Sequence, residues 1–365
     1  MRRSPTLHVI MPVYNGEEYI EQAIDSVINQ SYDRIQLYII DDGSIDNTLT
    51  ICNSIAERHS NVSVFKQNNS GVSAARNVGI KYAISIGCDD DYIAFIDADD
   101  IWIDNSVSET ILSSYSNSEM ICFQACYATY DFQKISRAFP ETTQTETIYD
   151  GYNNVWRAPM FSWMAFYRVS LLKKYGVLFT EGLRYNEDKI FAMKLFYLSA
   201  QTTFLPQTLY LYRSNETSAM NTRPRGAYYY LPIIDAWLKA DDEMKANNCF
   251  KNANFTFGSL LSSIYFIEMA IEHCEYFGDY KEIISIIKNH RHYETFLKLQ
   301  RNEVSQKQYK EFLLFNNKPR LFFIKHRFFG FFLRMAKYIK KTRLFSKFYN
   351  QHRFPFNNHY LNTTP

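Results

Sequence analysis

The chain has 365 residues, of which 46% are hydrophobic and 21% are charged, and this composition excludes a disordered or fibrous protein. The length exceeds what one core usually needs, so we expect one large domain with an appendage. The net charge of +2 hides an asymmetry, because residues 312–365 carry 11 Lys and Arg and no Asp or Glu. An acidic body therefore carries a basic, Phe-rich tail.

The cysteines and the N-terminus bear on the compartment. None of the six cysteines forms a CxxC pair or has zinc-like spacing with histidine, which indicates free thiols in a reducing compartment. The basic N-terminal sequence turns polar after one short strand, unlike a signal peptide. Because no run of about 18 apolar residues is present, no membrane-spanning helix is expected. A cytoplasmic protein is the expectation.

In the N-terminal part, short apolar runs alternate with segments of helical periodicity. The predicted strands are Leu7–Met11, Gln36–Ile40, Val62–Lys66 and Tyr92–Ile96, and the predicted helices are Glu17–Asn29, Asp46–Arg58 and Val72–Ser85. This order is typical of an α/β fold with a parallel, doubly wound sheet. Such sheets bind ligands beyond the carboxyl ends of their strands. Polar segments lie there at Pro12–Glu18, Asp41–Ser44 and Asp97–Asp100.

The rest of the chain divides in two. Residues 118–215 are mixed and contain one clear predicted helix, Glu187–Leu198. Further on the strand pattern fades, and helices are predicted at Ala227–Lys245, Phe255–Ile271 and Tyr280–Lys288. We therefore expect an α/β domain at 1–220, a helical region at 221–315 and a basic amphipathic tail at 316–365.

The turn Asp97-Ala98-Asp99-Asp100 is the first candidate site. In an extended segment Asp97 and Asp99 point the same way, because side chains alternate. Two such carboxylates, together with substrate phosphates, can hold Mg²⁺ or Mn²⁺. An acidic turn that only ends a strand and caps the next helix has the same pattern. The run Asp89-Asp90-Asp91 is interpreted as a solvated turn.

Three further features each have a common structural explanation and a functional one. Asp41-Asp42-Gly43-Ser44 can be an ordinary Asx turn, or Asp41 can accept a hydrogen bond from a base edge. Arg76 near the start of a helix can be a surface residue, or it can contact a base or phosphate. Arg213, at the end of a predicted strand, is either a surface residue or a clamp on a diphosphate.

These clusters occur together and in order. The segments VIMPVYNGEEYIEQAIDSVINQSY (9–32), YIIDDGSIDNT (38–48), QNNSGVSAARNVGI (67–80) and YIAFIDADD (92–100) closely resemble the nucleotide-sugar half of inverting family 2 glycosyltransferases. The match spans residues 7–105. It implies a GT-A (Rossmann-like) nucleotide-sugar domain at 1–220, a UDP-sugar donor, and Mn²⁺ or Mg²⁺ as cofactor.

The resemblance also assigns roles. It implies that the nucleotide-sugar is bound by Pro12, Val13, Tyr14, Glu18, Asp41, Arg76, Asp97 and Ala98. Within this set, Asp41 would bind the uracil ring and Arg76 would lie beside the base. Asp97 would contact the ribose or the metal, and Asp99 would ligate the cation that bridges the two phosphates. A cation there neutralises charge as the sugar–oxygen bond breaks.

An inverting transfer also needs a base for the acceptor hydroxyl. Asn186-Glu187-Asp188 resembles the family's Glu-Asp motif, so Asp188 would be the base and Glu187 would lie near the acceptor. Alternatively, these residues only begin a helix and are stabilised by its dipole. Trp163, in a segment similar to the family's acceptor region, is either a platform for a sugar ring or a core residue.

The basic tail can form one amphipathic helix with a Phe face, which suits an anionic membrane surface at 316–349. Packing of that face on the helical region is the alternative, and the acidic body argues against nucleic acid. The expected location is therefore peripheral, on the cytoplasmic face of the inner membrane.

The resemblance implies transfer of a hexose or N-acetylhexosamine to a hydroxyl of a lipid-linked glycan in bacterial surface polysaccharide, such as O-antigen, capsule or lipooligosaccharide. A degenerate scaffold or glycan-binding protein of the same fold is the alternative. A sugar nucleotidyltransferase is disfavoured, because residues 12–18 contain one Gly and two acidic residues where a triphosphate needs a Gly-rich, basic loop.

Overall fold

The computed structural model describes residues 3–107, 112, 115–132, 135–137, 145–151, 161–183, 185–214, 229–246 and 285. The chain forms two compact units, one of Met1–Arg223 with Lys239–Ser259 and one of Pro224–Leu238 with Leu260–Pro365. The first unit contains the sheet and the candidate site. The described part of the second unit comprises residue 285 and 229–238, which include the first half of helix α7 (Leu231–Ala246).

The first half of the sheet is parallel, as predicted. Its strands lie in the order β3-β2-β1-β4, and all three pairings are parallel. These strands are β1 (Leu7–Val13), β2 (Ile35–Asp41), β3 (Val62–Lys66) and β4 (Tyr92–Phe95). Val13 pairs with Asp41 at the carboxyl ends of β1 and β2. The polar segments that follow the strands therefore meet at one edge of the sheet.

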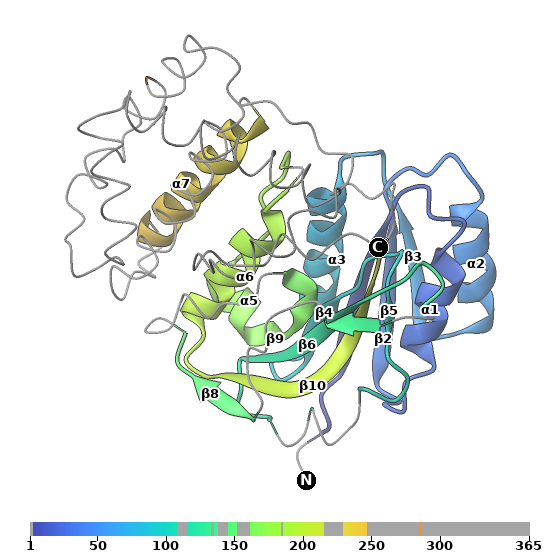
Figure 1. Cartoon of the computed structure of the whole chain (residues 1–365), viewed down its shortest axis with the longest axis horizontal. Coiled ribbons are helices and arrows are strands. Elements are labelled where there is room, and N and C mark those ends of the chain that lie inside the picture. The colour runs from blue at the N-terminus through green and yellow to red at the C-terminus, as the bar shows by residue number, and fades with distance from the viewer. Residues whose placement is uncertain are drawn as a thin grey trace, which may run out of the picture. The chain divides into compact units, whose positions relative to one another are not determined.

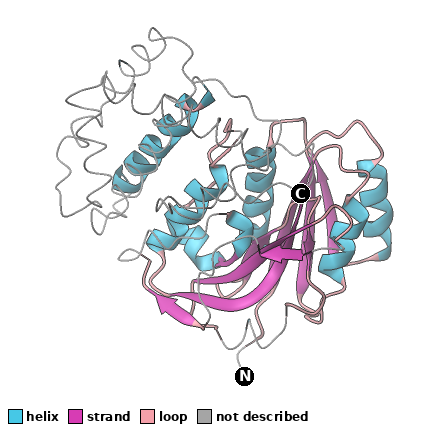
Figure 2. Cartoon of the chain, in the orientation of Figure 1, coloured by secondary structure: helices cyan, strands magenta, loops and turns pink. Residues whose placement is uncertain are grey.

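The three predicted helices of this half are present as α1 (Ile20–Ile28), α2 (Thr48–Arg58) and α3 (Val72–Ile86). α1 and α2 cover one face of the parallel strands and α3 covers the other (Figures 1 and 2). α3 packs closely on β1 at Gly79, where an added Cβ would lie 2.5 Å from a methyl carbon of Ile10. This close approach places the first turns of α3 beside the carboxyl ends of the strands.

The second half of the sheet is mixed rather than parallel. It continues from β4 in the order β9-β6-β10-β5, with β9 antiparallel to both neighbours and β10 parallel to β6. The elements are β5 (Ile101–Trp102), β6 (Met120–Ala128), β7 (Ile135–Arg137), β8 (Thr147–Tyr149), β9 (Ala165–Arg168), β10 (Thr202–Arg213), α5 (Val169–Tyr175) and α6 (Glu187–Leu198). α6 has the predicted bounds. The long β10 ends beside the acidic turn that follows β4.

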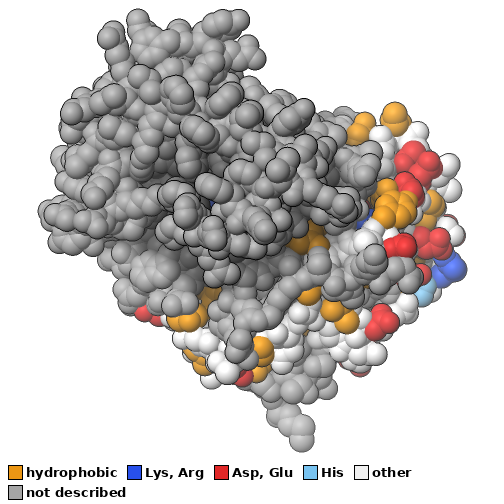
Figure 3. Space-filling model, viewed as in Figure 1, with side chains coloured by type: hydrophobic (Ala, Val, Ile, Leu, Met, Phe, Trp, Pro, Cys, Tyr) orange, Lys and Arg blue, Asp and Glu red, His pale blue; other side chains and the backbone are white. Residues whose placement is uncertain are grey.

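Several C-terminal predictions concern residues that the structure leaves undescribed. The helix expected at 227–245 corresponds to α7, whereas those at 255–271 and 280–288 and the membrane-binding tail at 316–349 lie outside the described residues. Of the helices in the described ranges, none combines the length and apolar character of a membrane span. Acidic side chains gather over the α1 and α2 side of the surface in Figure 3, as expected for an acidic body.

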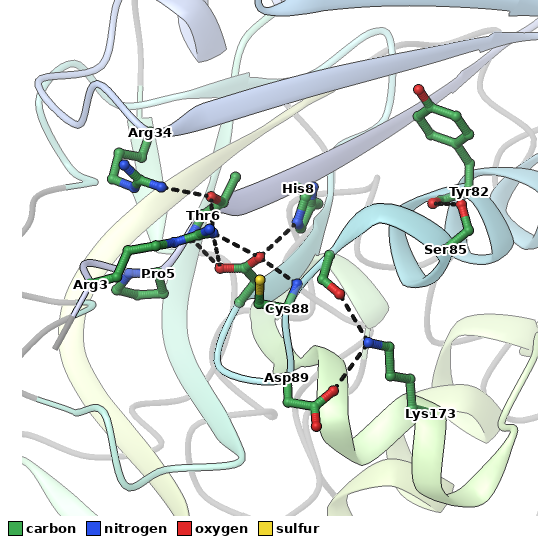
Figure 4. A network of polar contacts seen from close by, with 12 residues as sticks. Arg3, Pro5, Thr6, His8, Arg34, Tyr82, Ser85, Cys88, Asp89 and Lys173 are labelled. Atoms are coloured by element: carbon green, nitrogen blue, oxygen red, sulfur yellow. Dashed lines mark hydrogen bonds and ion pairs between the residues drawn. The ribbon is translucent and has the colours of Figure 1, made fainter.

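The interpretation of 89–91 as a solvated turn is wrong for Asp91, whose side chain is only 2% exposed. Its carboxylate accepts hydrogen bonds from the amides of Thr6 (2.7 Å) and Cys88 (2.8 Å) and from the guanidinium of Arg3 (2.9 Å). Figure 4 shows these partners converging from the segment before β1 and from the loop before β4. Asp91 thus joins the amino-terminal ends of two strands, opposite the candidate site.

Replacing Asp91 should destabilise the fold. Burial alone would raise the pKa of Asp91, but the hydrogen bonds from His8, Thr6 and Cys88 and the charge of Arg3 lower it to about 2. Because the folded pKa lies below the unfolded one, this stability is present above about pH 4 and is lost as the pH falls toward 2. Asp91→Asn should therefore lower the free energy of unfolding at pH 7 by about 2 kcal/mol.

Urea unfolding at several pH values measures this difference. Asp89→Asn is the control, because the Asp89 side chain is 75% exposed and, among the described residues, pairs only with Lys173 at the surface. A loss for Asp91→Asn no larger than the control's would contradict the role of this network.

Candidate active site

The loops after β1 and β2 form one fixed structure. The amide of Gly16 donates to the Thr48 hydroxyl at 2.8 Å, and the amide of Asn15 donates to the Ser44 hydroxyl at 3.0 Å. The Asn15 side chain in turn accepts the amide of Ile45 at 2.9 Å. Asn15 has a φ of +51°, which this side-chain bond supports. The two loops predicted to hold a nucleoside therefore support one another.

Asp41 lies at the end of β2 and is fully buried. Its Oδ1 accepts the amide of Ser44 at 3.3 Å, whereas its buried Oδ2 has no hydrogen-bond partner within the described residues. Leaving a buried carboxylate oxygen unpaired costs free energy, so this position fits an N–H donor from a ligand. Val13 pairs with Asp41 at the ends of β1 and β2, and Pro12 and Val13 are both buried. Tyr14, the next residue, is 49% exposed.

Asp42 fixes the loop that leads into α3, a role that the sequence did not indicate. One of its oxygens accepts the side chain of Gln67 (2.7 Å) and the amide of Ser70 (2.8 Å). The other accepts the amide of Gly71 at 2.8 Å, and Gly71 has a φ of +89° that favours glycine. This carboxylate thereby sets where α3 begins.

The acidic turn after β4 is anchored by β10 through Asp100. Asp100 is fully buried and accepts hydrogen bonds from the Tyr210 hydroxyl (2.6 Å) and the Arg213 amide (2.8 Å). The same hydroxyl accepts the amide of Asp97 at 3.1 Å. Tyr210 therefore holds both ends of the turn, which fixes the backbone that carries Asp97, Ala98 and Asp99.

Asp97 and Asp99 are the candidate ligand-binding residues of this turn, and Asp97 is also paired with Arg76 at 2.7 Å. Among the described residues, no other side chain pairs with the Asp99 carboxylate, which is hydrogen-bonded by its own backbone amide. Burial together with the Asp97 charge raises its pKa to about 6. The Asp97 side chain is 27% exposed. In the described part of the chain no three His, Cys, Asp or Glu residues converge as a metal site. Two carboxylates fit a divalent cation whose other ligands come from phosphates and water.

Arg76 does not behave as a surface residue. Its side chain is 2% exposed, and it pairs with Asp97 (2.7 Å), Asp188 (3.0 Å) and Glu187 (3.1 Å). Burial would lower the pKa of Arg76, but these three carboxylates raise it, so the guanidinium stays charged. The structure therefore places Arg76 between the acidic turn and α6. Contact with a nucleobase stays a prediction.

Glu187 and Asp188 begin α6 immediately after Asn186, which has a φ of +69°. Asp188 accepts hydrogen bonds from Arg76 and from the Ser162 hydroxyl and keeps 16% of its side chain exposed. Burial raises the pKa of Glu187 and of Asp188, despite the opposing charge of Arg76. A partly exposed carboxylate of raised pKa suits a general base.

The other candidates are mostly engaged within the protein. Trp163 is 1% exposed and stacks between Phe161 (4.8 Å) and Tyr210 (4.1 Å), so its indole is a core side chain here, and its acceptor role stays a prediction. Glu18 is exposed and accepts the Tyr130 hydroxyl.

Arg213 is also buried, and the surface interpretation is wrong for it. Its guanidinium donates to the Asp99 carbonyl (2.6 Å) and to Gln22 (2.7 Å) and lies 4.3 Å from the ring centre of Phe132. It therefore supports the acidic turn.

Comparisons with known proteins establish the fold and the family. TarS 1–349 of S. aureus, solved in complex with UDP-GlcNAc, superposes with a TM-score of 0.53 at 19% identity, over 84% of this chain and 79% of that chain. The fold is therefore GT-A, the fold of a class of glycosyltransferases.

The family follows from sequence. Residues 8–176 match the family described as Glycosyl transferase family 2. Glycosyltransferase GlyG of Streptococcus pneumoniae serotype 4 is 30% identical over 60% of this chain and 74% of its own length. Minor teichoic acid biosynthesis protein GgaA of Bacillus subtilis is 30% identical over 57% of this chain and 47% of its own length. The chain belongs to glycosyl transferase family 2.

Removing the Tyr210 hydroxyl should loosen the acidic turn. Tyr210→Phe leaves the buried Asp100 with one hydrogen bond fewer and the Asp97 amide without its acceptor, so we expect a loss of about 1–3 kcal/mol in unfolding free energy. Tyr212→Phe is the matched control on the same strand, because its hydroxyl forms no hydrogen bond with any described residue. Chemical unfolding of both variants measures the difference. Equal stabilities would contradict the anchoring role of Tyr210.

Proposed function

We propose that the protein is an inverting glycosyltransferase that moves a sugar from a UDP-sugar to a hydroxyl of a glycan acceptor. The observation that carries the proposal is the Arg76 cluster, in which a donor-side carboxylate (Asp97) and a base candidate (Asp188) are held by one guanidinium. A donor site and a base in one place are what a direct displacement needs.

Uridine fits the nucleoside side of this site. The unpartnered Oδ2 of Asp41 is an acceptor suited to the N3–H of uracil, and Tyr14 is an exposed aromatic ring against which a base can stack. The GT-A likeness to TarS, which was solved with UDP-GlcNAc, supports the same donor class. A hexose or N-acetylhexosamine is the proposed sugar.

Asp99 and Asp97 would hold Mn²⁺ or Mg²⁺ against the diphosphate. The carboxylate of Asp99 pairs with no other side chain in the described residues and lies close enough to Asp97 for the two charges to interact, so the pair suits a divalent cation. When bound, the cation supplies neutralising charge for the departing diphosphate.

The chemical step uses Asp188. Its carboxylate takes the proton of the acceptor hydroxyl while the acceptor oxygen forms a bond to the anomeric carbon. The bond from that carbon to the β-phosphate oxygen breaks on the opposite face, and its electron pair leaves with UDP. The products are the inverted glycoside, UDP and one proton, which passes from Asp188 to solvent.

The proposed acceptor is a lipid-linked glycan of bacterial surface polysaccharide. The name of GgaA, a teichoic acid biosynthesis protein, supports a cell-surface polymer, and the basic sequence of 316–349 supports attachment to an anionic membrane. Catalysis is preferred over a scaffold role, because Asp41, Asp97, Asp99 and Asp188 are all present and Asp188 is partly exposed.

Asp188→Asn should abolish sugar transfer without weakening the binding of the donor nucleotide. We expect kcat for UDP release from UDP-N-acetylglucosamine, UDP-glucose or UDP-galactose to fall by about 100-fold or more, with UDP affinity within about threefold of wild type. Asp25→Asn, an exposed acid on α1, is the charge control. Turnover by Asp188→Asn at the wild-type rate would contradict both the base and the inverting mechanism.

The pairing of Asp41 with uracil can be tested by changing either partner. Calorimetry should show about tenfold weaker UDP binding for Asp41→Asn, and similarly weak binding of N3-methyl-UDP to the wild type. The variant should no longer distinguish the two nucleotides, because the carboxylate that reads N3–H is gone. Equal binding of UDP and N3-methyl-UDP by the wild type would contradict this contact.

A further inference from the structure

The two oxygens of the Asp188 carboxylate have different surroundings. Oδ1 accepts hydrogen bonds from the Arg76 Nη1 atom at 3.0 Å and from the Ser162 hydroxyl. The backbone amide of Ser162 also donates to this carboxylate, whereas no side chain of the described residues donates to Oδ2. The Asp188 side chain as a whole is 16% exposed. Two side chains therefore hold Oδ1, and none of the described side chains holds Oδ2.

Arg76 connects this carboxylate to the donor side. Its Nη2 donates to Asp97 Oδ1 at 2.7 Å while Nη1 donates to Asp188 Oδ1. Because a guanidinium is planar and rigid, one group fixes the orientation of both carboxylates relative to each other. The guanidinium itself is held by burial and by the ring of Phe179, 5.2 Å from its centre.

Ser162 is also held in place. It is fully buried at the start of a short 3₁₀ turn, Ser162–Met164, and is followed by Trp163. Trp163 stacks on Tyr210, the residue whose hydroxyl holds the acidic turn. The turn that carries Ser162 and the turn that carries Asp97 therefore rest on the same side chain of β10.

We propose that Ser162 and Arg76 are positioning residues that hold Asp188 by Oδ1, so that Oδ2 is the oxygen that takes the acceptor proton. The inference rests on the proposed function, because it assigns an atom to the proposed base. It adds two residues that neither touch the proton nor bind the acceptor. Their effect is to prevent rotation of the carboxylate, and a misplacement of about 1 Å can cost about 100-fold in rate.

The test compares Ser162→Ala with Ser118→Ala. Ser118 is a matched control, because it is buried and its hydroxyl, within the described part of the chain, bonds only to Thr203, at 2.6 Å, away from Asp188. For Ser162→Ala we expect kcat for UDP release from the best of the three UDP-sugars to fall about 10- to 100-fold, with KM and UDP affinity within about twofold of wild type. Ser118→Ala should keep the wild-type kcat.

A second comparison separates positioning from a merely structural role. In the Asp188→Asn background, Ser162→Ala should cost little further activity, because Ser162 acts through the carboxylate that is already gone. Arg76→Lys should lower kcat about 100-fold, since an ammonium group cannot reproduce the two-pronged contact.

These outcomes distinguish the positioning role of Ser162 and Arg76 from the proposed function on which it rests. Full kcat for Ser162→Ala, or an equal loss in the wild-type and Asp188→Asn backgrounds, would overturn the positioning role while leaving Asp188 as the base. Wild-type activity in Asp188→Asn, or no UDP release from any donor, would instead overturn the proposed function.

Discussion

The site is organised around one buried positive charge. The guanidinium of Arg76 is surrounded by Asp97, Glu187 and Asp188, which come from two distant parts of the chain. Carboxylates held at low exposure repel one another and are costly to bury unless a cation is paired with them. Arg76 meets this requirement from α3, which packs closely on β1 at Gly79. The half of the fold with the proposed donor site and the half with the proposed base are thereby joined at Arg76.

β10 provides the second support. Its Tyr210 hydroxyl bonds to the Asp97 amide and to Asp100, and its ring stacks on Trp163 beside Ser162. The end of the strand adds Arg213, which holds the Asp99 carbonyl. Consequently the acidic turn and the turn next to Asp188 depend on one strand of the mixed half of the sheet. This arrangement explains why Trp163 is buried rather than exposed.

Much of the parallel half could be predicted from the sequence, because strand and helix periodicity are local properties. The meeting of the loops after β1, β2 and β4 followed from the rule for carboxyl ends of parallel strands. The helix start at Glu187 was likewise visible from its pattern. Each of these inferences needed only residues that are near one another in the chain.

Contacts between distant residues could not be predicted in this way. Arg76 and Asp188 are 112 positions apart, and nothing local distinguishes a buried arginine from a surface one. One signal was available, because Arg76 stands among Ser73, Ala74, Ala75 and Gly79, small residues typical of a helix face packed on a sheet. The burial of Asp91 and the roles of Tyr210 and Ser162 also depend on long-range partners. The run of acidic residues at 89–91 led to the wrong expectation that Asp91 is exposed to solvent.

The most direct test of the account is calorimetric titration of the full chain with UDP, GDP and CMP, each with and without Mn²⁺. A uridine site beside two carboxylates predicts that UDP binds best and that Mn²⁺ strengthens its binding. Preference for GDP or CMP, or UDP binding that Mn²⁺ leaves unchanged, would contradict the donor site described here.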